Sequence, residues 1–354
     1  MWYPLNLSFH TRSYAFGERL IPEKLGKKKV PEGVVAETWE VSDYKDTTAT
    51  VLKGRFAGKT LRDLTLTYPD ELVGQGWRGT HFPLLCKFLD ASHVLPVHLH
   101  ADDKTAKRKY SEPNGKSEAW HILYAAEDAS ILAGVKDGVT KQELFDAFKA
   151  QDYERVMPSM SIKTGDTVYV PAGIIHSFGP DTLIFEVQQT SDLTQHVMPT
   201  DVYGNALSEE VWESNIHETL EELRTHYQPR PQAGLAVEEE TIKRTICCAG
   251  PHFALERWTL KDSSTLTASP RRCTVLTNIG TDVTLEYAGG RETLKRAETC
   301  ILPAALEVTV KPECSAELLA CYVPDLVEDI TQPLMRAGHS LDEIKQLGEL
   351  TDSR

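Results

Sequence analysis

Three histidines and one glutamate are spaced in a way that strongly constrains what this chain can fold into. His98 and His100 stand two positions apart in an apolar run that predicts a strand, so both side chains point to the same face. Glu118 opens the next predicted strand, and a Gly-x5-Pro-x-Gly-x2-His turn presents His176 at the start of a later one. On neighbouring antiparallel strands, these four side chains can meet inside a small barrel. Such a set suits a borderline divalent ion, Zn²⁺, Fe²⁺, Mn²⁺ or Ni²⁺, with coordination positions left for water or substrate.

Short apolar runs bounded by turn residues predict a mainly β protein. Strands are predicted at 36–42, 82–90, 94–100, 118–124, 130–134, 161–162, 167–170 and 183–187, and again at 253–258, 274–277, 283–287 and 318–323. Helical spacing and capping boxes predict helices at 60–73, after Thr140, within 205–240 and after Ser340. The expected organisation is a metal-binding β-unit at 1–235 with an N-terminal extension and inserted helices, a second, metal-free β-unit at 240–324, and a helical tail at 325–354.

The charge of the chain limits its expected partners. Its 354 residues include 38 lysines and arginines against 52 aspartates and glutamates, which gives a formal net charge of −14. Nucleic acids and anionic membranes both favour positive surfaces, so neither is an expected partner. The sequence contains no apolar run of about 18 residues, no signal-peptide pattern at its start and no CxxC pair among its seven cysteines. These features predict a cytoplasmic protein with free thiols.

Longer stretches around the four residues resemble the type I mannose-6-phosphate isomerase family of the cupin superfamily. The similar segments are AETWEVS from Ala36, FPLLCKFLDA from Phe82, VHLHADD from Val97, GKSEAW from Gly115, YVPAGIIH from Tyr169 and EVQQTSDL from Glu186. The resemblance runs from about residue 10 to residue 200 and continues diffusely through the second β-region, which has no HxH pair. It implies a mainly β fold of two cupin-like antiparallel β-barrels (jelly roll) with a few inserted helices.

The resemblance also implies a metal centre. The metal ligands of the family fall on the residues already singled out by their spacing, His98, His100, Glu118 and His176. Family members usually have Gln at the position of His98, so this chain carries three imidazoles where its relatives carry two. The implied cofactor is a divalent metal, Zn²⁺.

Further family positions imply residues for substrate binding and catalysis. The substrate and phosphate contacts of the family fall near Ser42, Lys87 and Lys116, and its proton-transfer carboxylate falls on Glu186. An arginine that usually follows this carboxylate by about ten residues is replaced here by His196. Loss of that guanidinium removes a charge that is always present, and an imidazole substitutes for it only in part. We therefore assign Glu186, His196 and Lys116 to catalysis, and Lys87 and Ser42 to substrate binding.

The function implied by this resemblance is metal-dependent aldose–ketose isomerisation of a hexose phosphate, with mannose 6-phosphate and fructose 6-phosphate exchanging through a cis-enediolate. Two alternatives remain open from the sequence. A metal set of three histidines and one glutamate also serves cupin dioxygenases, which consume O₂. The missing arginine is also compatible with a non-catalytic sugar-binding cupin, which would bind a sugar phosphate without turnover. The sequence also leaves open whether the chain forms a homodimer.

Overall fold

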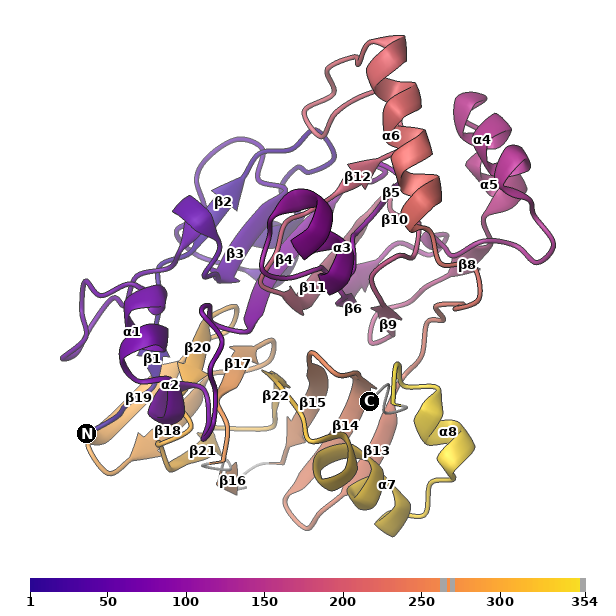
Figure 1. The fold of residues 1–354 in the computed structure, drawn as a ribbon. Coiled ribbons are helices and arrows are strands. Elements are labelled where there is room, and N and C mark those ends of the chain that lie inside the picture. The colour runs from indigo at the N-terminus through magenta and orange to yellow at the C-terminus, as the bar shows by residue number, and fades with distance from the viewer. Residues whose placement is uncertain (262–265, 268–270, 351–354) are drawn as a thin grey trace.

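The computed structural model describes residues 1–261, 266–267 and 271–350 of the chain (Figure 1). The described strands form four antiparallel sheets, which confirms the prediction of a mainly β protein, and none of these sheets closes on itself into a barrel within the described ranges. Residues 351–354 of the predicted tail lie outside the described residues. Among the residues that the structure describes, no helix has the length and apolar character needed to cross a membrane.

Two of the sheets come from the N-terminal part of the chain. The six-stranded sheet has the order β2 (His10–Arg12), β3 (Glu37–Val41), β4 (Leu84–Ala91), β11 (Thr182–Gln189), β6 (Glu118–Ala125) and β9 (Thr167–Val170). The five-stranded sheet has the order β12 (Gln195–His196), β5 (His98–Leu99), β10 (His176–Phe178), β7 (Ser130–Ala133) and β8 (Ser159–Ser161). Side chains of both sheets, such as Trp120 of the first and Phe178 of the second, share one buried cluster. The two sheets therefore pack face to face.

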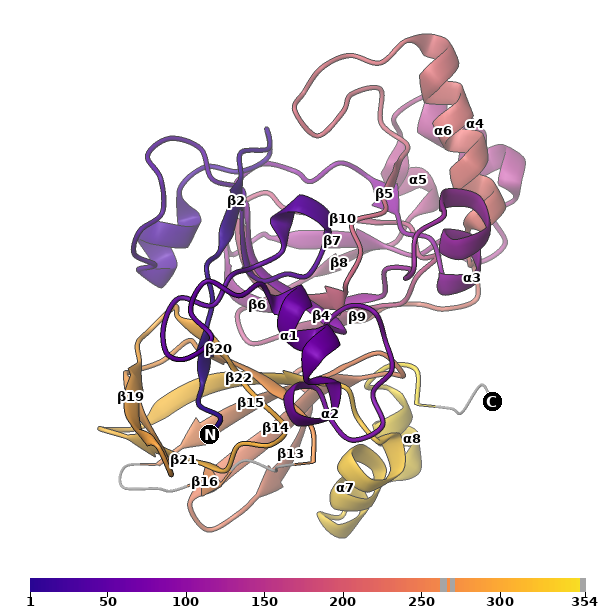
Figure 2. The same cartoon turned by 60° about the vertical axis from the view of Figure 1, so that its left-hand side comes forward.

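The other two sheets repeat this arrangement in the C-terminal part. The seven-stranded sheet has the order β1 (Leu5–Asn6), β20 (Thr299–Leu302), β17 (Thr274–Asn278), β22 (Ala316–Tyr322), β15 (Ala254–Leu260), β14 (Ile242–Ala249) and β13 (Leu235–Glu238). The four-stranded sheet has the order β16 (Leu266–Thr267), β21 (Val308–Pro312), β18 (Val283–Tyr287) and β19 (Gly290–Leu294). A second buried cluster, which includes Leu276 and Leu285, lies between them. The strand β1 reaches this pair from the N-terminus, beside β20 (Figure 2).

The two pairs of sheets are joined by a third core. Phe88 and Phe185 on the outer face of the six-stranded sheet share a buried cluster with Leu255 and Val275 of the seven-stranded sheet. Alternation along each strand explains this packing, because successive side chains point to opposite faces. The six-stranded sheet is thus buried on both faces, and the polar side chains on its inner face are shielded from solvent.

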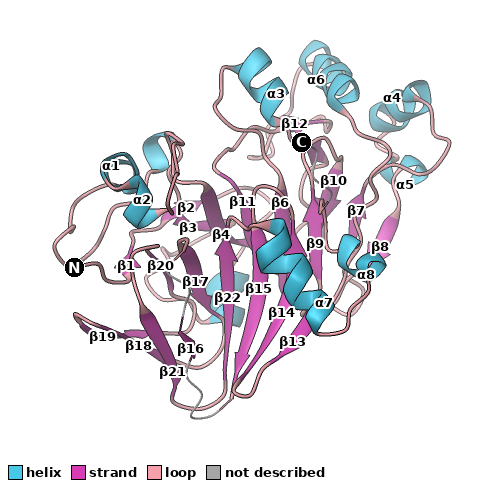
Figure 3. Cartoon of the chain, turned by 60° about the horizontal axis from the view of Figure 1, so that its bottom comes forward, coloured by secondary structure: helices cyan, strands magenta, loops and turns pink. Residues whose placement is uncertain are grey.

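Helices pack against the outer faces and the edges of the sheets (Figure 3). They are α1 (Leu61–Thr67), α2 (Pro69–Leu72), α3 (Asp103–Thr105), α4 (Lys141–Lys149), α5 (Tyr153–Val156), α6 (Glu209–Glu222), α7 (Gln332–Arg336) and α8 (Leu341–Lys345), with 3₁₀ or π turns at Ile21–Leu25, Lys45–Thr47, Ala106–Tyr110 and Leu326–Thr331. Helices α4 and α6 cover the outer face of the five-stranded sheet, where Phe148 and Trp212 pack in one cluster with Leu99. These two helices pack against the side of β5 that faces away from the six-stranded sheet.

Two predicted elements are shorter in the structure. The helical stretch predicted within 205–240 is helical only in α6, because Leu223 is already extended and the prolines at 229 and 231 cannot donate backbone hydrogen bonds. The strand predicted at 94–100 pairs only at His98–Leu99. Pro96 has no N–H to offer to a sheet ladder, so regular pairing begins after it.

Glu256 and Arg244 form an ion pair in the second pair of sheets, and we expect this pair to stabilise the fold. Glu256 accepts two hydrogen bonds from Arg244, at 2.9 and 2.7 Å, and one from Trp258 Nε1 at 2.6 Å. Burial opposes ionisation of Glu256, but Arg244 and these hydrogen bonds hold its pKa below the usual range. A group with a lowered folded pKa stabilises the protein at neutral pH, and that contribution is lost as the pH falls through the lowered pKa.

We therefore expect Glu256→Gln to lower the free energy of unfolding by about 3–5 kcal/mol, because Arg244 keeps its charge and loses its buried carboxylate partner, with only the half-exposed Glu239 left beside it at 3.6 Å. Chemical denaturation at pH 7 measures this change. The matched control is Glu286→Gln, which breaks the solvent-exposed pair with Lys311 and is expected to cost no more than about 1 kcal/mol. Equal losses in the two variants would contradict the prediction.

Candidate metal and substrate site

Strand alternation and register bring the predicted histidines together. On β5, Leu99 faces the helices α4 and α6, so His98 and His100 face the inside of the sheet pair. The register pairs His98 with His176 of β10 on one side and with His196 of β12 on the other. The ring centroids of His98 lie 4.2 Å from His176 and 5.8 Å from His196. The predicted HxH and turn-His motifs therefore meet on neighbouring strands.

Backbone carbonyls orient three of these rings. Nδ1 of His98 lies 2.6 Å from the carbonyl oxygen of Pro96, Nδ1 of His100 lies 2.7 Å from that of Leu193, and Nδ1 of His176 lies 2.8 Å from that of Ile174. A carbonyl only accepts, so each Nδ1 carries the proton and each Nε2 keeps a lone pair. This is the tautomer that a metal-binding imidazole needs, with its second nitrogen fixed by a neighbouring group.

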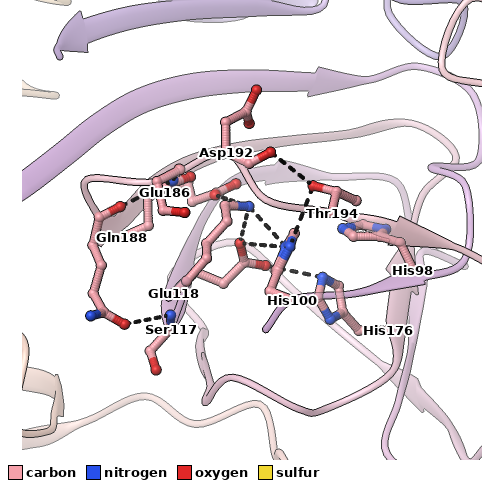
Figure 4. Close-up of polar contacts among 12 residues, drawn as sticks. His98, His100, Ser117, Glu118, His176, Glu186, Gln188, Asp192 and Thr194 are labelled. Carbon is pink, nitrogen blue, oxygen red and sulfur yellow. Dashed lines mark hydrogen bonds and ion pairs between the residues drawn. The ribbon is translucent and has the colours of Figure 1, made fainter. Parts of the chain in front are cut away.

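Glu118 completes the set from the facing sheet. Its Oε2 lies 3.2 Å from Nε2 of His100, and its Oε1 lies 3.1 Å from Nε2 of His176 (Figure 4). Nε2 of His176 is buried and makes no hydrogen bond within the described part of the chain. Trp120 Nε1 donates to Oε1 of Glu118 at 2.9 Å, and Lys116 Nζ donates to its Oε2 at 2.6 Å. Two neighbours thus hold this carboxylate in place.

The donor set fits a divalent cation. Ligand atoms of His98, His100 and His176 lie within 4.8 Å of one another, and all three residues are buried. Nε2 of His100 accepts a hydrogen bond of 2.8 Å from the ammonium of Lys116, so its lone pair points toward a positive charge. Three imidazole nitrogens with one carboxylate oxygen are ligands that Zn²⁺ and other borderline ions prefer.

The protonation states of His98, His100 and Glu118 also favour metal binding. Burial, followed by the neighbouring His176 ring, lowers the pKa of His98 well below its usual value. Burial and then the charge of Lys116 lower the pKa of His100 to about 3. Burial by itself would raise the pKa of Glu118, but Lys116 and His100 hold it well below the usual range. At neutral pH, His98 and His100 are therefore neutral and Glu118 is ionised, which are the forms that bind a metal.

A cavity of about 240 Å³ opens in front of this cluster. Its lining residues are Tyr14, Phe16, Glu37, Lys87, Leu89, Leu95, Pro96, His98, His100, Lys116, Glu118, Phe178, Glu186, Asp192, Thr194, His196 and Val202. They come from both sheets of the first pair and from the loops around them. The cavity brings every predicted site residue together except Ser42 and His176, and His176 lies directly behind it against His98.

Glu186 is the second carboxylate of the cavity. It lies on β11, in register with Lys87 of β4 and with Trp120 of β6. Its Oε1 is buried, makes no hydrogen bond to any described residue, and lies 3.5 Å from Nζ of Lys87 and 3.5 Å from Nζ of Lys116. Burial and then the charge of Glu118 raise the pKa of Glu186 to about 8. A carboxylate with a pKa in this range can both take and return a proton near neutral pH.

His196 and Ser42 have different surroundings. His196 lines the cavity, and its Nδ1 is buried without a hydrogen-bond partner among the residues that the structure describes. Burial lowers its pKa to about 4, so the ring is neutral at neutral pH. Ser42, by contrast, is not among the residues that line the cavity. Its hydroxyl lies 3.1 Å from that of Thr47 and accepts a hydrogen bond from the backbone N–H of Tyr44, so it stabilises a local turn.

Two acidic residues of the cavity were missed in the sequence. Glu37 accepts a hydrogen bond of 2.9 Å from Nζ of Lys87, and Asp192 lies in the loop after β11, where burial raises its pKa. Asp192 is part of the EVQQTSDL segment, and Glu37 is part of AETWEVS. Their positions inside these family-like segments could have marked both residues as site candidates. Only the pairing of β3 with β4 shows that Glu37 faces the cavity.

Comparison with known proteins points to one family. Residues 5–136 match the family of the phosphomannose isomerase type I catalytic domain. The chain is 36% identical over 172 residues to the probable mannose-6-phosphate isomerase GmuF of Bacillus subtilis, an alignment that covers 49% of this chain and about half, 54%, of that protein. It is 28% identical over 237 residues to the mannose-6-phosphate isomerase ManA of the same organism, covering 67% of this chain and 74% of ManA.

Solved structures extend the likeness in fold to most of the chain. The mannose 6-phosphate isomerase from Bacillus subtilis superposes with a TM-score of 0.81 at 24% identity, over 91% of this chain and 100% of that one. A putative mannosephosphate isomerase from Archaeoglobus fulgidus superposes with a TM-score of 0.69 at 20% identity, over 91% and 99% of the two chains. Motifs, fold and sequence matches agree: residues 5–136 match the catalytic domain of type I phosphomannose isomerase, and the fold of most of the chain resembles that of solved mannose 6-phosphate isomerases.

Proposed function

We propose that this chain is a metal-dependent aldose–ketose isomerase that interconverts mannose 6-phosphate and fructose 6-phosphate. One observation carries the proposal: Glu186, whose buried Oε1 has no hydrogen-bond partner among the described residues, shares a cavity with the oriented cluster of His98, His100 and Glu118. An isomerase of this class needs a base for the carbon-bound proton and a centre that stabilises the enediolate. The relatives described above are named for the same reaction.

The metal ligands in this proposal are His98, His100, Glu118 and His176, and the metal is Zn²⁺. When bound, a divalent ion of this kind supplies electrostatic stabilisation for negative charge that develops on sugar oxygens. The chain itself supplies the oriented lone pairs and the buried environment, in which charges interact more strongly than in water. The cytoplasmic location expected from the sequence and a sugar phosphate as the partner agree with this chemistry.

Proton transfer is assigned to Glu186. Its carboxylate removes the proton from C2 of the aldose and returns it to C1, while the hydroxyl proton on O2 is transferred to O1, so aldose and ketose differ only in where two protons sit. Lys116 and Lys87 each lie 3.5 Å from Glu186 and orient it within the cavity. His196, with a free and buried Nδ1, hydrogen-bonds a sugar hydroxyl and assists. Burial holds these groups in place before substrate arrives.

The finer architecture follows from the same family assignment. We propose that each pair of sheets is a cupin-like jelly roll, with the metal-binding unit at 1–235, the metal-free unit at 240–324 and the helical tail from 325 onward. The face-to-face packing of the first two sheets and of the last two supports this division. The pairing of β1 with β20 adds one N-terminal strand to the second unit.

The direct test is an interconversion assay of mannose 6-phosphate and fructose 6-phosphate with metal-loaded and chelator-treated protein. We expect activity in the loaded sample, loss after chelation and recovery when Zn²⁺ is added back. Oxygen uptake is measured in parallel and is expected to be absent. Turnover that consumes O₂, or metal binding without any exchange of the two sugar phosphates, would refute the proposal.

The raised pKa of Glu186 predicts how kcat/KM depends on pH. A base must be ionised, so kcat/KM is expected to rise with pH and to level off above the pKa of this group. The midpoint of this rise in kcat/KM is expected at or below about pH 8, because a bound dication lowers the pKa of a carboxyl group beside it. A pH profile of kcat/KM for mannose 6-phosphate measures it. A profile that falls over the range from pH 6 to pH 8 would exclude Glu186 as the base.

A further inference from the structure

The glycine turn before β10 is hydrogen-bonded to two other segments of the metal site. The backbone N–H of Gly173 donates to the carbonyl oxygen of His100 at 2.8 Å. The backbone N–H of Ala172 donates to the hydroxyl of Ser117 at 3.1 Å, and Ser117 directly precedes the carboxylate ligand on β6. His176 enters β10 three residues after Gly173. The position of this turn is therefore coupled to three of the four proposed ligands.

Arg224, which follows α6, holds the other side of the turn. Its backbone N–H donates to the carbonyl oxygen of Gly173 at 2.8 Å, and its Nη1 donates to that of Ala172 at 3.3 Å. Gly173 has a φ of +87°, a conformation that other residues rarely adopt. A Cβ at this position would lie 2.8 Å from both Cγ and Cδ of Arg224. The arginine stem therefore lies directly against the turn, while its guanidinium binds one of the turn carbonyls.

A residue of the C-terminal tail fixes this guanidinium. Nη2 of Arg224 donates to Oε1 of Glu349 at 2.9 Å, and the hydroxyl of Tyr169 on β9 donates to Oε2 of the same carboxylate at 3.4 Å. The tail is itself attached to the seven-stranded sheet, where the backbone N–H of Ala249 donates to the carbonyl oxygen of Leu347 at 3.1 Å. Glu349 therefore connects the tail to β9 and, through Arg224, to the turn that follows β9.

We propose that Arg224 and Glu349 are positioning residues of the metal centre, through which the C-terminal tail holds the turn at 171–173 in the geometry that the ligands need. The proposal rests on the metal-dependent function proposed above. Neither side chain is among the residues that line the cavity, so both act on the metal ligands and not on the substrate. Their side chains are 32% and 27% exposed, and an ion pair this accessible adds little to stability by itself.

Arg224→Met tests this role. Methionine keeps an unbranched side chain against Gly173 but removes the guanidinium that binds Ala172 and Glu349. We expect the affinity for Zn²⁺ to fall by about tenfold or more, because groups that orient a metal ligand are worth about 10–100-fold in affinity. Competition with a chromophoric chelator measures the affinity of the full-length protein, and the circular dichroism spectrum shows whether the variant is folded.

The matched control is Arg272→Met. Arg272 also binds a residue near the C-terminus, Asp329, at 2.6 Å, and its guanidinium lies 4.0 Å from the ring centroid of Tyr322. These partners belong to the C-terminal part of the chain, which carries none of the proposed ligands. We expect Arg272→Met to lose stability but to keep its Zn²⁺ affinity within about twofold of wild type, since Arg272 orients no metal ligand. Equal affinities in the two methionine variants would overturn the inference.

Glu349→Gln gives a second, milder variant. The amide has the size of the carboxylate but no charge, so it holds the guanidinium of Arg224 less firmly. We expect an intermediate loss of Zn²⁺ affinity, and no further loss when Glu349→Gln is added to Arg224→Met, because the two residues act through one contact. Losses that add in the double variant would overturn the inference and leave the isomerase function standing. Wild-type protein that binds no Zn²⁺ would instead refute the metal-dependent isomerase on which the inference rests.

Discussion

Glu186→Gln is expected to lower kcat for sugar interconversion by about 10²- to 10⁴-fold, the range that a positioned general base contributes. The amide keeps the size of the side chain and its place on β11 but cannot accept the C2 proton. Oε1 of Glu186 makes no hydrogen bond, and its nearest cations are 3.5 Å away, so the substitution breaks no short contact to this atom. Kinetic assays at saturating substrate measure the loss, and elemental analysis should find the metal content unchanged.

The control for this variant is Glu40→Gln. Glu40 lies in the same sheet, is equally buried and pairs with Lys27 at 2.8 Å, but it is not part of the cavity lining. Its loss is expected to reduce stability and leave kcat of the folded enzyme within about twofold of wild type, since surroundings away from the reacting atoms do not enter the proton transfer. Comparable losses of kcat in both variants would show that Glu186 acts only through the fold.

His176→Ala is expected to weaken metal binding by more than about 100-fold, because even groups that merely orient a ligand are worth 10–100-fold. Nε2 of His176 points at Glu118 without a hydrogen bond, and its Nδ1 is fixed by the carbonyl of Ile174. Removal of the ring takes one of three convergent lone pairs away. Competition with a chromophoric chelator measures the affinity, and activity at limiting metal should fall with it.

The matched control for this variant is His121→Ala. His121 is also a buried histidine of the first sheet pair, and its pKa is lowered to about 3 by burial. Its Nδ1 lies 2.8 Å from the hydroxyl of Thr167, away from the cavity lining. We expect His121→Ala to lose stability but keep its metal affinity. Full metal content in the His176→Ala variant would remove His176 from the ligand set.

The clustering of the three histidines could be predicted because it depends on local rules. Alternation along a strand places His98 and His100 on one face, and the glycine-proline turn determines where His176 enters β10. Neither rule needs knowledge of which strands pair across the sheet. The structure adds what is not local: the register that places His196 beside His98, and the carbonyls that select the tautomers.

The substrate side of the site was less predictable. Glu37 faces the cavity because β3 pairs with β4, where Trp39 stands opposite Lys87. Pairing between strands that are far apart in the sequence cannot be predicted from either strand by itself. The register shifts between Trp39 and Val41, and a bulge of this kind ends the regular alternation. The face taken by Ser42 could therefore not be read from periodicity. The pairing of β1 with β20 is non-local in the same way.

In the proposed reaction, Glu186 moves a proton between C1 and C2 of a sugar held at the histidine cluster. Interconversion of mannose 6-phosphate and fructose 6-phosphate in D₂O, followed by NMR with the metal-loaded enzyme, tests this step. We expect the two sugars to exchange and deuterium to enter at C1 of the ketose and C2 of the aldose, with both signals lost in Glu186→Gln. No exchange, or undiminished exchange and labelling in Glu186→Gln, would contradict it.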